Sequence, residues 1–145
     1  MMQGPVRVSG YVTAHSAHIA RYGAMPATLV EQSGGLTMAH LQLIPVAFLQ
    51  ALDASEAVGT NYDRVWLEQR IDVPWLGVRL TGVWTYRSLH GPVVNGEGLM
   101  ELGPQKQALA HAAECAGWQL ELEPFVYLMV RDAGFRGAVT QALKA

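Results

Sequence analysis

The stretch Phe48–Ile71, FLQALDASEAVGTNYDRVWLEQRI, decides the fold because its spacing changes from helical to strand-like in the middle. Its first residues place apolar side chains three or four positions apart after a proline, so we expect a helix over Pro45–Ser55. A Gly-Thr-Asn turn follows, and from Tyr62 the side chains alternate as in a strand with its more apolar face toward the core. Two carboxylates, Asp53 and Glu56, therefore lie at a helix-to-strand corner.

Strand patterns occupy most of the chain before this helix. Residues 6–20 alternate loosely, with β-branched residues early, and predict a strand that ends near the histidines. The QSGG sequence at residues 32–35 predicts a turn, and residues 36–44 predict a mostly buried strand because neither face is purely polar. A further strand is expected over residues 78–88.

Helices dominate the end of the chain. After a glycine-rich loop, Pro104 opens an alanine-rich helix that should stop at Gly117. We expect residues 124–145 to be helical with a break at Gly134 or Gly137. Strands, one helix, more strands and then helices predict the α+β class. We expect one domain over residues 1–145, with a small mixed, barrel-like sheet and flanking helices.

The composition limits the classes of function. The 145 residues are 50% hydrophobic and 15% charged, so the chain should fold around a core. A net charge of -2 with scattered basic residues gives no electrostatic reason to expect nucleic acid. The single cysteine excludes an internal disulfide framework and suits a reducing compartment. With neither a signal-peptide pattern nor a membrane-length apolar run, we expect a cytoplasmic protein without a membrane partner.

Two constellations of metal-ligating residue types are weak. His15 and His18 lie three apart and His40 follows on another segment, but the helical spacing conflicts with the strand pattern and no carboxylate or cysteine is close in sequence. His111 and Cys115 would share one face of a helix, yet they supply only two ligands, and a small thiol packed in the core is the simpler interpretation. We therefore expect no metal and no cofactor.

The segment from residue 35 to 71, followed by LTGVWTYRS, resembles the gamma-glutamylcyclotransferase-like family. In that family a short helix ends in a Leu-Asp-x-x-Glu-Gly-like element, a tyrosine opens the next strand, and a later strand ends in an aromatic residue. The resemblance covers roughly residues 6–117, and Ala57 stands where the family often has glycine. The matching residues are Leu52, Asp53 and Glu56 for the element, Tyr62 for the tyrosine and Tyr86 for the aromatic.

The resemblance implies a cyclotransferase, of lyase or acyltransferase type, that acts on a small γ-glutamyl amine or related amide. Glu56 would be the general acid/base at the mouth of the largest pocket, with a pKa raised by burial. Tyr62 and Tyr86 would line the substrate site. The local residues themselves make Asp53 structural, since it can cap or bond the turn around Gly59 and Asn61. Considered without the resemblance, Glu56 is more simply a surface acid at a helix end, and both tyrosines are core aromatics with a satisfied hydroxyl.

One difference from the family leaves the activity open. The family begins with a strand and a Tyr-Gly-Ser-Asn-like loop whose backbone amides bind substrate, whereas this sequence starts after that point. Three functions remain: an enzyme, a non-catalytic small-ligand-binding protein on the same fold, or a dimeric interaction protein. A missing first strand would leave a sheet edge uncovered, so we expect a homodimer.

Overall fold

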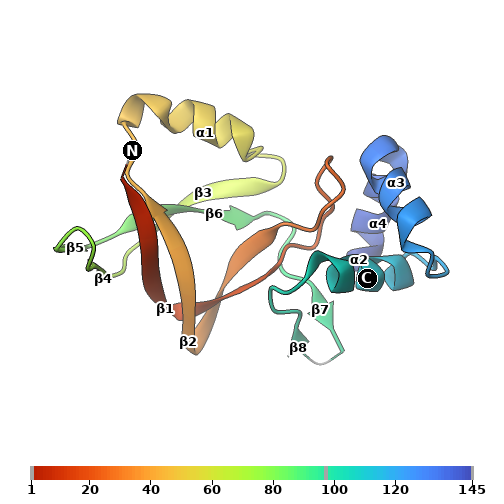
Figure 1. Cartoon of the computed structure of the whole chain (residues 1–145), viewed down its shortest axis with the longest axis horizontal. Helices are drawn as coiled ribbons and strands as arrows, with labels where there is room; N and C mark the ends of the chain where they lie inside the picture. Colours follow the sequence, from red (N-terminus) through yellow and green to blue (C-terminus); the bar gives the residue numbers. More distant parts are fainter. Residues whose placement is uncertain (1, 97, 145) are drawn as a thin grey trace. The chain divides into compact units, whose positions relative to one another are not determined.

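The computed structural model describes residues 2–96 and 98–144 and contains both strands and helices, which confirms the α+β class (Figure 1). The elements follow one another as β1 (Gln3–His15), β2 (Ala27–Gln42), the 3-10 turn η1 (Val46–Phe48), α1 (Leu49–Ser55), β3 (Tyr62–Leu67), β4 (Ile71–Val73), β5 (Val78–Leu80), β6 (Val83–Ser88), β7 (Val94–Asn95), β8 (Gly98–Leu99), α2 (Gln105–Cys115), α3 (Leu122–Arg131) and α4 (Ala133–Leu143).

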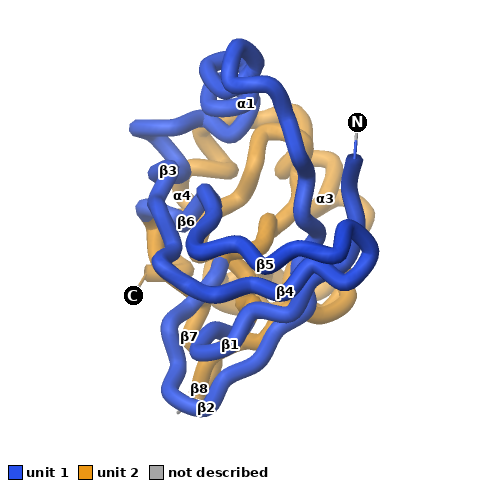
Figure 2. Tube along the Cα trace, turned by 90° about the vertical axis from the view of Figure 1, so that its left-hand side faces the viewer, with its two compact units in different colours: residues 1–12, 29–89 blue, residues 13–28, 90–145 orange. Residues whose placement is uncertain are grey.

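The chain divides into two compact units (Figure 2). The first unit comprises residues 1–12 and 29–89, and the second comprises residues 13–28 and 90–145. Each unit has its own hydrophobic core: Val6, Ile71 and Val73 are buried together in the first, and a larger cluster is buried in the second. The assignment of the whole chain to one domain stays a prediction.

The strands pair in twos rather than in one sheet. β3 pairs with β6, β4 with β5 and β7 with β8, each antiparallel, and β1 pairs with β2. The described residues therefore form no closed barrel, and the predicted single mixed, barrel-like sheet is not what the structure shows. Two residues explain part of the difference. Pro74 cannot donate to a strand ladder, and Gly82 separates β5 from β6 within the predicted strand over residues 78–88.

β2 differs from the sequence prediction in two ways. The predicted turn at residues 32–35 lies inside one continuous strand of 16 residues, in which Gly34 adopts a φ of 75°. A side chain at Gly35 would meet the carbonyl of Tyr11 on β1, so the two strands approach closely at this glycine. The strand over residues 36–44 is also not mostly buried, because Leu36 and Met38 are more than half exposed.

The helices of the second unit follow the predicted starts and stops, except that α3 begins at Leu122 rather than Pro124 and that the last helical region breaks elsewhere. α2 begins after Pro104, and Gly117 just beyond it has a φ of 71°, as expected for a helix C-terminus. The break in the last helical region falls at Asp132 and not at Gly134 or Gly137. The Asp132 side chain accepts a hydrogen bond from the backbone nitrogen of Phe135 at 3.0 Å, so it caps α4.

The second unit's core explains why the C-terminal segment is so apolar. Phe125 and Met129 of α3 are fully buried, and Phe125 packs edge-to-face against Phe135 of α4 with ring centroids 5.7 Å apart. Tyr127 and Val130 on the same helix remain largely exposed. None of the helices in the described part of the chain is both long and apolar enough to span a bilayer.

Candidate functional site

The helix-to-strand corner is fixed by the backbone of the residues after α1. Ala57 has a φ of 50°, in the left-handed region. It is the residue at which the chain leaves the helical direction after α1 has ended. The nitrogen of Val58 donates to the carbonyl of Asp53, and the nitrogen of Ala57 donates to that of Ala54. These two bonds are the pair that closes a helix in a Schellman motif, where glycine is preferred at the left-handed position.

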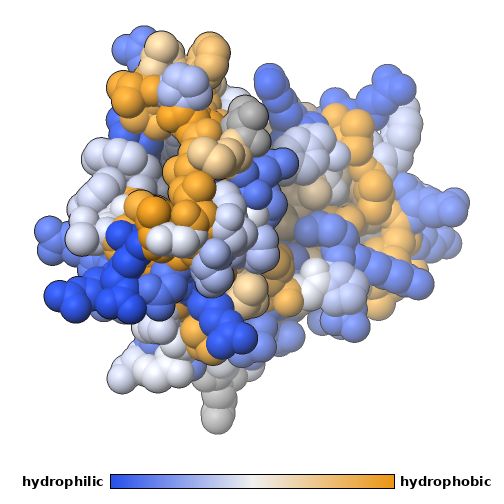
Figure 3. Space-filling model, turned by 60° about the vertical axis from the view of Figure 1, so that its left-hand side comes forward, coloured by the Kyte–Doolittle hydropathy of each residue, from blue (hydrophilic) through white to orange (hydrophobic). Residues whose placement is uncertain are grey.

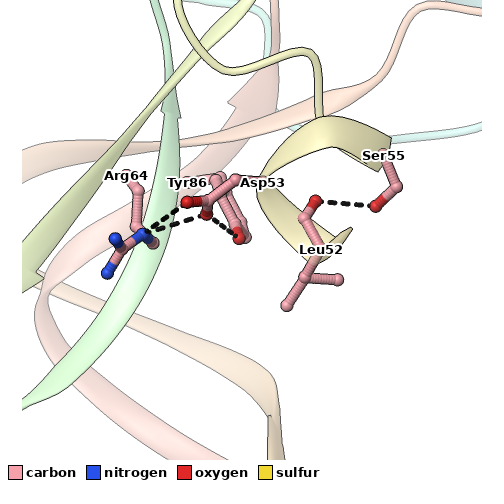
Figure 4. A network of polar contacts seen from close by, with 5 residues as sticks. All are labelled: Leu52, Asp53, Ser55, Arg64 and Tyr86. Atoms are coloured by element: carbon pink, nitrogen blue, oxygen red, sulfur yellow. Dashed lines mark hydrogen bonds and ion pairs between the residues drawn. The ribbon is translucent and has the colours of Figure 1, made fainter. Parts of the chain in front are cut away.

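Asp53 fastens the end of α1 to the β3–β6 pair (Figure 4). Its carboxylate lies 2.9 Å from the Nε atom of Arg64 on β3 and accepts a hydrogen bond of 2.7 Å from the hydroxyl of Tyr86 on β6. We expected Asp53 to bond the turn through its side chain; instead its main-chain carbonyl holds the turn and its carboxylate joins the two strands. The side chains of Asp53 and Arg64 are 22% and 25% exposed, so this ion pair is partly shielded from water.

The face of the β3–β6 pair that carries Arg64 and Tyr86 also carries two tryptophans. The register pairs Arg64 with Tyr86 and Trp66 with Trp84, and residues opposite each other or two apart share a face. The two indoles meet edge-to-face with centroids 5.1 Å apart, and the Arg64 guanidinium carbon lies 4.4 Å from the centroid of the Trp84 ring. The ring of Trp66 also covers Gly82, where a Cβ atom would collide with it.

A pocket of about 450 Å³ lies among these elements within the first unit, in the size range of small-molecule sites. The lining is mainly aliphatic and aromatic, with a few polar side chains. It comprises Val6, Val8, Leu29, Ala39, His40, Leu41, Gln42, Leu43, Ile44, Leu49, Leu52, Glu56, Trp66, Leu67, Ile71, Leu80, Val83, Trp84, Thr85 and Tyr86. In Figure 3 an apolar band runs down the surface from the top of the view, the side on which Figure 1 shows α1.

The three predicted site residues have different places. Glu56, the C-terminal cap of α1, is half-buried and lines the pocket. Tyr86 also lines it; burial raises the pKa of its hydroxyl, and so does the hydrogen bond to Asp53, which needs the proton in place. Tyr62 is buried and is not among the lining residues. The structure thus brings Glu56 and Tyr86 together and places Tyr62 elsewhere.

Sequence reasoning missed Arg64 and the two tryptophans as parts of the site. Their positions contained a signal, because Arg64 and Trp66 share one parity on their strand, as Trp84 and Tyr86 do on theirs. Large aromatic side chains on the face of a strand that is predicted to point away from the core indicate a covered or ligand-binding face. The sequence did not indicate which strands pair or that α1 lies against this face.

The histidines near the N-terminus belong to the second unit. His15 is buried, with Nδ1 3.2 Å from the carbonyl of Met25 and Nε2 accepting from the nitrogen of Gly103, so the geometry fits a neutral ring protonated on Nδ1. His18 is hydrogen-bonded to the hydroxyl of Ser16 at 2.5 Å and stacks on His90. Within residues 2–96 and 98–144, no three His, Cys, Asp or Glu side chains are placed to hold a metal ion.

The His111–Cys115 pair lies on α2 at an Sγ–Nε2 distance of 3.5 Å. The thiol is exposed rather than packed in the core, which corrects the sequence interpretation. Partial desolvation raises the pKa of Cys115, and the neighbouring Glu114 acts in the same direction, so the thiol has no reason to be unusually reactive.

Comparisons with known proteins bear on the fold alone. No family model matches this chain, and no curated protein matches it. The crystal structure of YkqA from Bacillus subtilis is similar, with a TM-score of 0.51 and 20% sequence identity over 89% of this chain. The chain spans 44% of the length of the YkqA chain. The α+β arrangement described above is therefore similar to that of a solved protein.

Proposed function

We propose that the pocket of the first unit is a cyclotransferase-like active site. It would bind a small γ-glutamyl amine, or a related amide, with Glu56 as general acid/base. The observation that carries the proposal is the position of Glu56, which is half-buried in the wall of a largely apolar pocket of ligand size. A carboxylate in such a wall is screened less by water than one on a free surface. The resemblance of the Leu52–Glu56 element and of Tyr86 to the gamma-glutamylcyclotransferase-like family supports the same assignment.

The chemistry needs one group that moves a proton twice. The neutral α-amine of the γ-glutamyl group attacks its own δ-carbonyl carbon, which forms the C–N bond of a five-membered lactam. Glu56 takes the proton that the attacking nitrogen loses and gives it to the leaving nitrogen as the amide bond breaks. The products are 5-oxoproline and a free amine, with no water consumed. Because the reaction is intramolecular, a pocket that holds the chain folded lowers much of the barrier.

Arg64 is the group that we assign to the α-carboxylate of the γ-glutamyl end. Its Nε atom faces Asp53, while its two terminal nitrogens point away from Asp53 in Figure 4 and make no hydrogen bond to any residue in the described part of the chain. The guanidinium lies over Trp84, which lines the pocket. A planar guanidinium with two terminal nitrogens still available is suited to receive a carboxylate.

A second candidate, a non-catalytic small-ligand-binding protein, is favoured by the hydrogen bond of Tyr86. Lactam formation develops negative charge on the carbonyl oxygen, which must be met by aligned donors. The hydroxyl of Tyr86 already donates its proton to Asp53, so it is not such a donor. A binding protein needs the pocket and Glu56 but no oxyanion donors, and substrate turnover therefore separates the two candidates.

The decisive experiment is to measure 5-oxoproline release from γ-glutamyl amines by the wild-type protein and by Glu56→Gln. For an enzyme, the wild type releases the lactam, and Glu56→Gln loses at least about 100-fold in kcat because the amide keeps the shape but cannot exchange a proton. Glu114→Gln, which neutralises an exposed acid on α2 in the other unit, is the control and should keep full activity. Binding without any lactam release would establish the second candidate and exclude the first.

A further inference from the structure

We propose that the pocket selects γ-glutamyl amines whose amine portion is apolar and carries no carboxylate. This inference rests on the proposed function and concerns the part of the ligand that leaves. It follows from the charges around the pocket, from the chemistry of its walls and from its volume.

The charges of the pocket wall disfavour an anion inside it. Among its lining residues in the described part of the chain there is no lysine or arginine, and the one acidic side chain is Glu56. A ligand carboxylate placed there would lose water, gain no lysine or arginine partner and lie near another carboxylate. Arg64, outside the lining and against Trp84, supplies a partner for one carboxylate, which the γ-glutamyl end already has. A second carboxylate, on the leaving amine, would find only the side chains of His40, Gln42 and Thr85 as polar partners in the wall, and none of them carries a fixed positive charge.

The walls of the pocket favour a ligand whose amine portion is apolar. Leu49 and Leu52 lie on the same side of α1 as Glu56, since they precede it by seven and four residues, and all three line the pocket. Trp66 and Trp84 line it from the strands, and about half of each of these residues is exposed. An alkyl or aryl group would bury this aliphatic and aromatic surface, at roughly 25 cal/mol for each Å² removed from water.

The volume sets an upper limit on the ligand. A cavity of about 450 Å³ is at the lower end of the range for small-molecule sites, so it suits a γ-glutamyl group joined to one ring or a short alkyl chain. The class of ligand that fits is therefore a γ-glutamyl arylalkylamine or alkylamine, rather than a γ-glutamyl amino acid or peptide.

The test is a matched pair of ligands that differ by one carboxylate. γ-Glutamyl-phenethylamine and γ-glutamyl-phenylalanine share the same ring and the same γ-glutamyl end. Calorimetric titration of Glu56→Gln, which does not turn them over, gives both dissociation constants for a wall without the Glu56 charge, so it measures the preference set by the rest of the lining. 5-Oxoproline release by the wild type gives kcat/KM with that charge present. We expect the phenethylamine derivative to be favoured by at least about 10-fold in both, which corresponds to about 1.4 kcal/mol.

The two measurements separate the inference from the proposed function. If neither compound releases 5-oxoproline, the enzymatic proposal fails. The selectivity can then still be measured, as the ratio of the two dissociation constants, on both the wild type and the variant. Equal binding of the two compounds, tighter binding of the phenylalanine derivative, or no binding of either would overturn the inference even in an active enzyme.

A charge added to the wall gives an independent check. Leu49→Lys places an ammonium on the lining face of α1 and should bring the ratio of the two dissociation constants close to one. Gln50→Lys adds the same charge to the same helix at an exposed position outside the lining, so the ratio should remain as in the wild type. An unchanged ratio in a folded Leu49→Lys protein, verified by circular dichroism, would contradict the assignment of the charge effect to this wall.

Discussion

Single side chains carry the link between α1 and the strands, and Asp53 is the clearest case. One carboxylate meets a guanidinium and a phenol that come from two strands. Removal of this carboxylate leaves Arg64 and Tyr86 partly buried without their acceptor. The free energy of unfolding should therefore fall by more than the value of an average hydrogen bond. The same carboxylate also keeps the Arg64 guanidinium against Trp84, so its effect extends to the wall of the pocket.

We predict that Asp53→Ala lowers the free energy of unfolding by about 1–3 kcal/mol, as measured by urea denaturation. The control is Asp72→Ala, which breaks the Asp72–Arg79 pair. The side chains of that pair are 67% and 61% exposed, so water screens them and the change should be clearly smaller. Equal effects of the two substitutions would show that Asp53 is only a surface charge.

A second prediction at the residue scale concerns pH. Burial lowers the pKa of His18 to about 4, and the positive charges of His90 and Lys144 act in the same direction. Above pH 6.5 the ring is neutral in both the folded and the unfolded protein, and between 6.5 and about 4 mainly the unfolded chain takes up the proton. The free energy of unfolding should therefore fall as the pH is lowered through this interval, and His18 should add no further dependence below it.

Denaturation curves at several pH values test this, with His18→Gln as the comparison. The variant cannot take up the proton, so its free energy of unfolding should depend less on pH between 6.5 and 4 than that of the wild type. His90 remains in the variant, and because burial lowers its pKa too, part of the dependence should persist. A variant that keeps the full wild-type slope would contradict the assignment to His18.

At the scale of elements, the end of α1 decides where Glu56 lies. The Schellman-type bonds stop the helix at Ser55, and the left-handed Ala57 directs the chain toward β3. The family that the sequence resembles often has glycine at this position. The geometry explains why, since glycine adopts this conformation without the steric penalty of a Cβ atom.

We predict that Ala57→Gly raises the free energy of unfolding by up to about 1 kcal/mol, because relief of the left-handed strain outweighs the greater freedom of the unfolded chain. The same exchange three residues earlier, Ala54→Gly, removes a good helix former from inside α1 and should lower stability by about 1 kcal/mol. Chemical denaturation of the two variants should thus give opposite signs. Destabilisation by both would mean that the left-handed position carries no strain.

For the molecule as a whole, the homodimer stays a prediction, and the exposed apolar surface of the first unit supports it. Leu36 and Met38 on one face of β2 are 58% and 59% exposed, and Phe48, the last residue of η1 just before α1, is 59% exposed. Large apolar side chains at alternate positions of a strand are typical of a surface that is covered by another chain.

We expect light scattering at micromolar concentration to give the mass of two chains, and Met38→Glu to return it to that of one. The substitution puts a charge on the exposed face of β2, where dimer formation would bury it. Lys106→Glu, on exposed α2, is the matched control and should remain dimeric. A monomer mass for the wild type would show that the chain leaves this face to solvent.

The sequence by itself determined the local elements. Proline at the start of a helix, glycine at its end and period-two alternation act between neighbouring residues, so the helix over Leu49–Ser55, the helix stop at Gly117 and the strand that begins at Tyr62 were all predictable. The resemblance also pointed to Glu56 and Tyr86 as neighbours in one site. The break at Asp132 was missed because a side-chain cap outweighed the glycines inside α4.

Only the tertiary structure decided what surrounds these elements. Strand partners depend on contacts between residues far apart in the sequence, so the paired strands in place of one barrel-like sheet could not be derived from alternation. The same holds for the pocket. The register of β3 against β6 puts Arg64, Trp66, Trp84 and Tyr86 on one face, and the Asp53 carboxylate fixes α1 over it. Tyr62, opposite Ser88, has the same parity in that register as Arg64 and Trp66, yet it is buried and outside the lining. Strand alternation therefore did not distinguish it from Tyr86, and only the packing at the end of the strand pair did.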